Sequence, residues 1–276
     1  MKLVHKILLA CLPLMAVGSP CWADTSDTTG PTPWGITYQE AVTPVMHRIE
    51  SLSAEINVVL VGVVLLVSGL LAYVVFKFNA KANPTPATWS HHTPLEIVWT
   101  LIPVLILVLI ALPSFTLLFY MELSQKADVT VKVTGHQWYW SYEYPDENDI
   151  KFDSFVVSDG DLKPGQPRLL TADNALVLPV GAVVRIQITS DDVIHSWSIP
   201  AFGVKVDAMP GRLNETWVRV DKPGLYYGQC SQLCGVNHGY MPIMVKVVPR
   251  EEYHAWSDDM WHRIARSRQQ IIGDNR

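Results

Sequence analysis

Two long apolar stretches constrain the fold of this chain more than any other feature. They cover residues 56–78 and 95–121, and each is long enough to cross the hydrocarbon core of a bilayer as a helix. The second contains Pro103 and Pro113, which membrane helices tolerate when neighbouring groups satisfy the freed carbonyls. Neither stretch has a polar face, as a surface helix of a soluble protein would. We therefore predict a two-helix transmembrane hairpin.

The charges around these stretches predict the topology of the hairpin. The connector, residues 79–94, follows Lys77, contains Lys81 and has no Asp or Glu, so the positive-inside rule places it in the cytoplasm. The chain starts with two lysines, an apolar run and small residues before Asp24, which is typical of a signal peptide over residues 1–23. A lipoprotein signal ending at Cys21 is disfavoured by the preceding Pro20. Residues 24–55 are then a periplasmic segment.

From residue 127 onward the hydrophobic pattern changes to a period of two. Val129, Val131 and Val133 alternate with polar residues, and further short alternating runs are separated by Pro and Gly turns. This pattern is typical of an all-β sandwich or barrel, here over residues 127–250. The tail, residues 251–276, has a helical and polar pattern, and its candidate packing anchors are Tyr253, Trp256 and Trp261.

Near the end of the β region, one short loop carries an unusual set of metal donors. The run C-S-Q-L-C-G-V-N-H-G-Y-M places Cys230, Cys234, His238 and Met241 within twelve residues. The two cysteines are compatible with a disulfide, and with His195 and His238 they would also suit zinc. Neither alternative uses Met241, whereas copper binds thiolate, imidazole and a weak axial Met together. Two thiols in one such loop favour two copper ions bridged by two thiolates.

Five stretches of the chain, in order, resemble subunit II of cytochrome c oxidase. They are the donor loop and four others: G-H-Q-W-Y-W-S-Y-E-Y, D-D-V-I-H-S-W, V-K-V-D-A-M-P-G-R-L-N and P-G-L-Y-Y-G-Q-C. The resemblance implies an α+β membrane protein, in which the hairpin precedes a Greek-key cupredoxin-like domain in the periplasm of a bacterial inner membrane. It also implies a function: electrons pass from cytochrome c through a binuclear copper A centre to haem in subunit I of a proton-pumping oxidase.

The same resemblance implies a set of copper ligands. These are the side chains of His195, Cys230, Cys234, His238 and Met241 and the backbone carbonyl of Gln232. Gln232 departs from the family pattern, in which a glutamate also helps to bind magnesium at the contact with subunit I. A neutral amide is a weaker ligand for a hard dication than a carboxylate, so the resemblance leaves magnesium in doubt.

Further roles are implied for residues outside the ligand loop. Trp138 matches the tryptophan through which cytochrome c delivers electrons, and Glu96 matches a glutamate at the mouth of a proton path. Without the resemblance, Glu96 is equally compatible with a residue at headgroup level. Four acidic residues match positions that receive the lysines of cytochrome c, although acids on a β domain are often only solvated: Glu143, Asp149, Asp173 and Asp192.

The expected partners are cytochrome c, oxidase subunits I and III, and the lipid bilayer. A net charge of −5 argues against nucleic acid and fits a basic protein partner. The sequence has no C-x-x-C-H motif, so we expect no haem of its own. Two other functions compete with this interpretation. One is subunit II of a quinol oxidase, which lacks the copper ligands, and the other is a membrane-tethered copper carrier.

Overall fold

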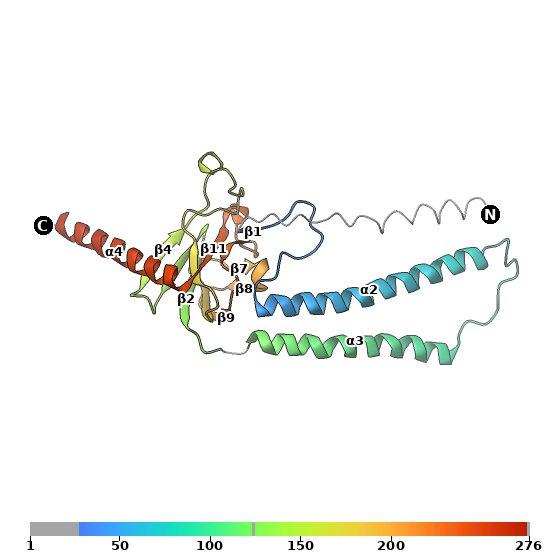
Figure 1. The fold of residues 1–276 in the computed structure, drawn as a ribbon. Coiled ribbons are helices and arrows are strands. Elements are labelled where there is room, and N and C mark those ends of the chain that lie inside the picture. The colour runs from blue at the N-terminus through green and yellow to red at the C-terminus, as the bar shows by residue number, and fades with distance from the viewer. Residues whose placement is uncertain (1–27, 123–124, 275–276) are drawn as a thin grey trace.

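The computed structural model describes residues 28–122 and 125–274, and the side chains of residues 30–122 and 125–266. The predicted signal peptide, residues 1–23, lies outside the described residues. Two long helices, α2 (Pro44–Lys77) and α3 (Thr93–Glu122), run side by side away from a β domain (Figure 1). Both are long and apolar enough to cross a membrane. The chain is therefore a helical hairpin followed by a β domain, as the sequence predicts.

Helix α2 begins twelve residues before the predicted membrane segment, because Thr43 caps it and Pro44 occupies its first turn. The Thr43 hydroxyl accepts a hydrogen bond from the Met46 amide at 3.1 Å, and proline is favourable at the start of a helix. Val45 and Met46 are buried, so the first turn packs against the β domain instead of entering lipid. Hydropathy predicts only the apolar part of α2, because the capped first turns of the helix are not continuously apolar.

The β domain consists of two larger sheets and a two-stranded ribbon. The four-stranded sheet has the order β1 (Thr28–Thr29), β10 (Gly224–Gln229), β11 (Pro242–Val248) and β5 (Leu176–Pro179). The five-stranded sheet has the order β4 (Ile150–Ser154), β3 (Tyr139–Tyr144), β2 (Val129–His136), β6 (Val184–Ser190) and β9 (Asn214–Val218). The ribbon pairs β7 (His195–Ile199) with β8 (Val204–Ala208), and three short 3₁₀ turns complete the domain: η2 (Asp159–Asp161), η3 (Pro200–Phe202) and η4 (His238–Tyr240).

Both larger sheets are mixed, because β2 pairs parallel with β6, and β11 parallel with β5. The predicted alternation is present: on β2, Val129, Val131 and Val133 are buried and alternate with partly exposed residues. The sequence left two all-β architectures open, a sandwich and a barrel. Among the described residues the strands form separate packed sheets, and no sheet closes into a barrel.

The C-terminal helix α4 (Arg250–Asp274) leaves the domain on the side away from the hairpin (Figure 1). Tyr253 is 1% exposed, and Trp256 packs against the core, as predicted. Trp261 is 42% exposed, so its prediction as a packing anchor is wrong. It lies two turns beyond Tyr253, on a different face of the helix from Met260 and Ile264, which do reach the core.

Several contacts fix the hairpin to the domain. The Val42 amide donates to the Ala201 carbonyl at 3.3 Å, and the Thr43 hydroxyl donates to the Phe202 carbonyl at 2.8 Å. On α3, the ring of Tyr120 packs edge-on against Trp217 of β9. The Arg48 guanidinium of α2 lies over the same Tyr120 ring, 3.7 Å from its centre. The start of α2 is thus joined directly to η3, the turn that follows β7, and α3 is joined to β9.

Candidate metal centre

The metal donors are gathered where strand β10 ends and strands β7 and β11 begin. His195 is the first residue of β7, Cys230 follows β10, and Met241 directly precedes β11. Cys230, Cys234 and Met241 belong to the hydrophobic core, although they lie in a loop. Strand β10 passes so close to β7 that a Cβ at Gly228 would lie 2.0 Å from the Ser198 carbonyl oxygen. Glycine at this position therefore permits the approach that brings Cys230 to His195.

The donor atoms form a compact group centred on two sulfurs. The Sγ atoms of Cys230 and Cys234 are 3.8 Å apart, well beyond the ~2.05 Å of a disulfide bond. His195 Nδ1 lies 3.9 Å from the Cys230 sulfur. The donor atoms of His195, Cys230 and Cys234 all lie within 4.8 Å of one another, close enough to hold one metal ion. His238 Nδ1 lies 3.5 Å from the Cys234 sulfur. Each sulfur thus has the other as a neighbour and an imidazole of its own.

The remaining two predicted ligands are close to the same group. The Gln232 carbonyl oxygen lies 3.4 Å from the Cys230 sulfur, while the Gln232 side chain is at the surface. Met241 is fully buried, and its carbonyl accepts a hydrogen bond from the Cys230 amide at 3.0 Å. Two thiols, two imidazoles, a thioether and a carbonyl form a soft donor set that fits copper.

Burial and hydrogen bonding give the two thiols unequal acidities. Burial acts to raise the pKa of Cys230, but hydrogen bonds from His195 and from the Ser196 backbone outweigh it and lower the pKa to about 7. Burial and the neighbouring Cys230 charge raise the pKa of Cys234. The two sulfurs therefore resist carrying two negative charges unless a cation joins them. A metal cation bound to both thiolates would remove this repulsion, because metal ligation favours the deprotonated form of a thiol.

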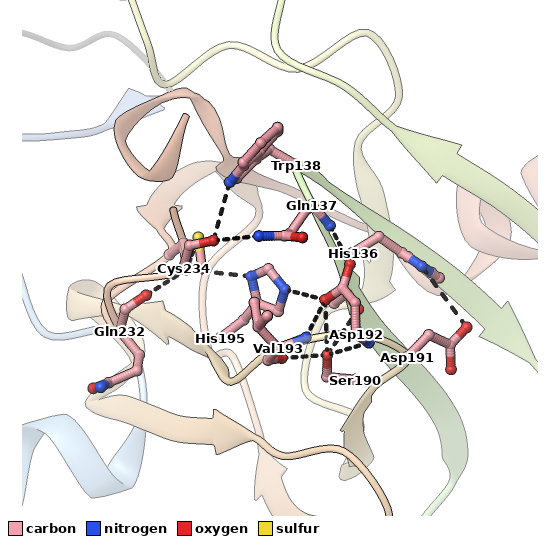
Figure 2. A network of polar contacts seen from close by, with 12 residues as sticks. His136, Gln137, Trp138, Ser190, Asp191, Asp192, Val193, His195, Gln232 and Cys234 are labelled. Carbon is pink, nitrogen blue, oxygen red and sulfur yellow. Dashed lines mark hydrogen bonds and ion pairs between the residues drawn. The ribbon is translucent and has the colours of Figure 1, made fainter. Parts of the chain in front are cut away.

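One carboxylate with a predicted role in docking, Asp192, is also part of the network behind the site. Asp192 Oδ1 lies 2.8 Å from His195 Nε2 and accepts a hydrogen bond from the Val193 amide at 2.6 Å (Figure 2). Asp192 Oδ2 accepts from the Gln137 amide at 2.6 Å. A carboxylate on the outer ring nitrogen of a ligand histidine fixes its tautomer and orientation. The spacing Asp-x-x-His was the sequence signal for this role.

Strand β2 and the turn that joins it to β3 contribute contacts of their own. Gln137 Nε2 and Trp138 Nε1 both donate to the Cys234 carbonyl, at 2.9 and 3.2 Å (Figure 2). A Cβ at Gly135 would lie 2.9 Å from Cδ2 of His195, so glycine is needed for this imidazole to fit. The partly exposed Trp138 is therefore bonded to the backbone of a proposed ligand.

Two family models match this chain. "Cytochrome C oxidase subunit II, periplasmic domain" matches residues 129–248, and "Cytochrome C oxidase subunit II, transmembrane domain" matches residues 31–117. The chain belongs to the cytochrome c oxidase subunit II family. This confirms the resemblance, and its members are components of a haem–copper oxidase.

Two relatives are similar to most of the chain, and one solved domain is similar to about half of it. A Rickettsia bellii protein, named as a probable cytochrome c oxidase subunit 2, is 49% identical over 91% of this chain and 91% of its own length. Cytochrome c oxidase subunit 2 of Cereibacter sphaeroides is 46% identical over 82% of this chain and 80% of its own length. The crystal structure of the periplasmic domain of subunit II (CoxB) of Bradyrhizobium japonicum is 51% identical, covers 51% of this chain and 99% of that domain, and has a TM-score of 0.48.

The four acidic residues with a predicted role in docking have different surroundings in the structure. Glu143 of β3 lies 2.9 Å from Lys151 and 3.9 Å from Lys132, so its charge is compensated within the sheet. Asp173 accepts hydrogen bonds from the Phe155 and Asn174 amides at 2.8 and 2.7 Å, and its residue is exposed. Asp149 is exposed in the turn before β4. Only Asp192 joins the metal centre.

Glu96 lies in the first turn of α3, at the end of the hairpin away from the β domain (Figure 1). Its carboxylate accepts a hydrogen bond from the His92 amide at 3.1 Å, and the His92 ring accepts from the Leu95 amide at 3.2 Å. Glu96 thus helps to cap the helix. This contact gives Glu96 a structural role. Its role in a proton path stays a prediction.

Proposed function

We propose that this chain receives electrons from cytochrome c at a binuclear copper centre and passes them to subunit I of the oxidase. The observation that carries the proposal is the pair of buried sulfurs 3.8 Å apart, each with an imidazole nitrogen within 4 Å. The proposed ligands are His195, Cys230, the Gln232 carbonyl, Cys234, His238 and Met241. When bound, a thiolate-bridged copper pair supplies a one-electron redox centre, and the protein supplies position and environment.

The residues around the donors are suited to keeping them still. His195 lies on a strand and is fully buried, with Asp192 holding its outer nitrogen. Met241 is equally buried, and both cysteines are at most 6% exposed. An electron-transfer site needs ligands that move little between oxidation states, and a buried shell of this kind also controls solvent access and potential. Intact donors also argue against a quinol-oxidase subunit.

The proposed route for electrons begins at Trp138. Its ring is partly exposed, and its N–H bonds the Cys234 carbonyl at 3.2 Å, so it connects the surface to the ligand loop directly. We assign the basic partner, cytochrome c, to this face. The net charge of −5 supports attraction of a basic protein, with Asp149 and Asp173 as exposed contributors.

The proposed setting is a bacterial inner membrane with the β domain in the periplasm. The two spanning-capable helices and the lysines of the connector support it. The apolar side chains of α2 and α3 are largely exposed, and we assign them to lipid and to subunits I and III. In this orientation Glu96 lies at the cytoplasmic end of α3. We propose that it lies at the entrance of a proton path.

Magnesium is not part of the proposal for this chain. The Gln232 side chain is at the surface beside the ligand loop and offers an amide oxygen where the family has a carboxylate. Hard dications prefer carboxylates, so we expect weak magnesium binding at the contact with subunit I. Manganese titration of the purified oxidase, followed by electron paramagnetic resonance, measures this affinity.

Copper stoichiometry of the purified chain in detergent, together with electron paramagnetic resonance, tests the proposed function. We expect two coppers per chain and hyperfine splitting from both nuclei. Cys234→Ser removes one bridging sulfur and should abolish the shared signal. Ser231→Ala, in the same loop, should preserve it, because Ser231 bonds only the Gln229 carbonyl through its hydroxyl. A single, readily exchanged copper in the wild type would contradict the proposal and favour a copper carrier.

A further inference from the structure

Residues 155–175 form an excursion between β4 and β5, and the proposed function gives a role only to Asp173 within it. The excursion is closed at its base by the bridge between Val156 and Ala172 and by the hydrogen bond from the Val157 amide to the Thr171 carbonyl at 3.0 Å. Within it, the Arg168 guanidinium pairs with Asp159 at 2.8 Å. The segment projects from the domain as a loop (Figure 1).

Gln229 connects this excursion to the ligand loop. Its Nε2 donates to the Leu169 carbonyl at 3.1 Å and to the Gly239 carbonyl at 3.3 Å. A terminal amide has two hydrogens on one nitrogen, so each carbonyl receives its own bond. Gln229 is the last residue of β10, and Gly239 directly follows His238 in η4. One side chain therefore joins a sheet, the excursion and the turn that carries a proposed ligand.

The backbone conformation of Leu169 also suggests that a tertiary contact holds this residue in place. Leu169 has φ of 62°, in the left-handed region that residues with a Cβ seldom occupy. Such a conformation persists where surrounding contacts determine it. Gln229 provides such a contact.

The two proposed histidine ligands are held in different ways. His195 is fully buried on a strand and has a carboxylate on its outer nitrogen. His238 lies in an exposed three-residue turn, where local bonds join its amide to Gly235 and the Tyr240 amide to Asn237, at 3.2 and 2.9 Å. A turn held by such short-range bonds needs an anchor to a rigid element if its imidazole is to stay 3.5 Å from the Cys234 sulfur.

We propose that Gln229 is a positioning residue for His238, and that residues 155–175 act on the metal centre through it. The proposal rests on the proposed function of the site. Gln229 holds the Gly239 carbonyl to the end of β10, while the Leu169 carbonyl holds the Gln229 amide in place. The excursion thus stabilises one half of the centre, the half that contains Cys234 and His238.

The first test compares Gln229→Ala with Gln187→Ala in the copper-loaded full chain in detergent. Gln187 is a matched control, because it lies on a strand and its Nε2 makes a single bond to Glu215 at 2.6 Å, in the other sheet. We expect Gln229→Ala to keep two coppers, to change the nitrogen hyperfine coupling of one histidine, and to release copper to a chelator about tenfold faster, as for other residues that orient ligands. Gln187→Ala should change neither quantity.

The second test removes the other side of the contact. Replacing residues 158–170 with a short Gly-Ser linker keeps the closed base of the excursion and deletes the Leu169 carbonyl. We expect a change of hyperfine coupling and release rate in the same direction as Gln229→Ala. The variant with both changes should differ from the wild type by less than the sum of the two single effects on the copper release rate. The reason is that both changes break the same connected set of hydrogen bonds.

A measurement without copper separates this proposal from the proposed function. Hydrogen exchange at the Tyr240 amide should accelerate in metal-free Gln229→Ala and stay unchanged in Gln187→Ala. If the wild type failed to bind two coppers, the proposed function would fall, while Tyr240 exchange would still decide whether Gln229 holds the turn. Unchanged exchange, hyperfine coupling and release in Gln229→Ala, or equal changes in Gln187→Ala, would overturn the positioning role.

Discussion

At the scale of single residues, Asp192 shows how one carboxylate can orient a proposed metal ligand, His195, without being a proposed ligand itself. Its two oxygens meet the His195 ring, the Val193 amide and the Gln137 amide. These bonds lower the pKa of Asp192 in spite of burial, which acts in the opposite direction as the largest single influence. Because the carboxylate is committed to these donors, its negative charge serves the orientation of His195 first and the attraction of a partner second.

Asp192→Asn should therefore weaken copper binding by roughly 10- to 100-fold, the usual cost of losing a residue that orients a ligand. With its oxygen toward His195, the Asn amide group would face the Gln137 N–H, donor against donor. Asp191→Asn is the matched control, because Asp191 is exposed and lies 3.7 Å from His136, away from the ligands. Competition with a chelator measures the affinity, and equal losses in both variants would show that charge alone matters.

Tyr226 should make the stability of the domain depend on pH in the alkaline range. Burial, and then the Glu40 charge, raise the pKa of Tyr226 to about 12, against about 10 in an unfolded chain. The folded state thus keeps a proton that the unfolded state loses. Its contribution to stability is complete below about pH 10 and is lost as the pH rises through the folded value.

Urea unfolding between pH 9 and 11.5 measures this slope. Tyr226→Phe should make the slope shallower, while lowering stability at all pH values because the bond to the Lys222 carbonyl at 2.8 Å is lost. Tyr38→Phe serves as the control, since Tyr38 is 56% exposed. A slope unaffected by Tyr226→Phe would mean that other groups carry the alkaline transition.

At the scale of elements, the cap of α2 connects the membrane hairpin to the strand that carries His195. The Thr43 hydroxyl accepts from the Met46 amide and donates to the Phe202 carbonyl, which lies in η3 directly after β7. Thr43 is 1% exposed, so water cannot replace these bonds if the hydroxyl is removed. The cap is therefore both the start of a membrane helix and a support for the domain above it.

Thr43→Val keeps the shape of the side chain and should lower the free energy of unfolding by about 2 kcal/mol, through the lost cap and an unpaired buried carbonyl. Thr116→Val is the control, because Thr116 bonds only the preceding turn of its own helix, the Leu112 carbonyl at 2.9 Å. Chemical denaturation of the purified chain measures both. Similar losses would mean that the contact with Phe202 adds nothing.

At the scale of the whole molecule, we expect the acidic surface to set the rate at which a basic partner associates. Glu143 is compensated by two lysines, whereas Asp149 is exposed in a turn. We expect Asp149→Asn to slow association with cytochrome c several-fold at low ionic strength, and Glu143→Gln to slow it less. Asn suits the left-handed backbone of this position, where φ is 54°. Stopped-flow association across a salt series measures the rates, and a larger effect for Glu143→Gln would reverse this ranking.

The sequence by itself determined the elements whose signals are local. Apolar length predicted the hairpin, a period of two predicted the β domain, and the donors spaced along Cys230–Met241 predicted a copper loop, because each pattern depends on neighbours within a few residues. Three contacts that complete the site join residues 35, 55 and 60 positions apart: His195 with Cys230, Gln137 with Asp192, and Leu169 with Gln229. Only the packing of the strands decided these, since no local pattern specifies which distant loops meet. For the same reason, the sequence predicts docking roles for Asp192 and Glu143 but not their neighbours within the domain. Only the fold places His195 beside Asp192 and Lys151 beside Glu143.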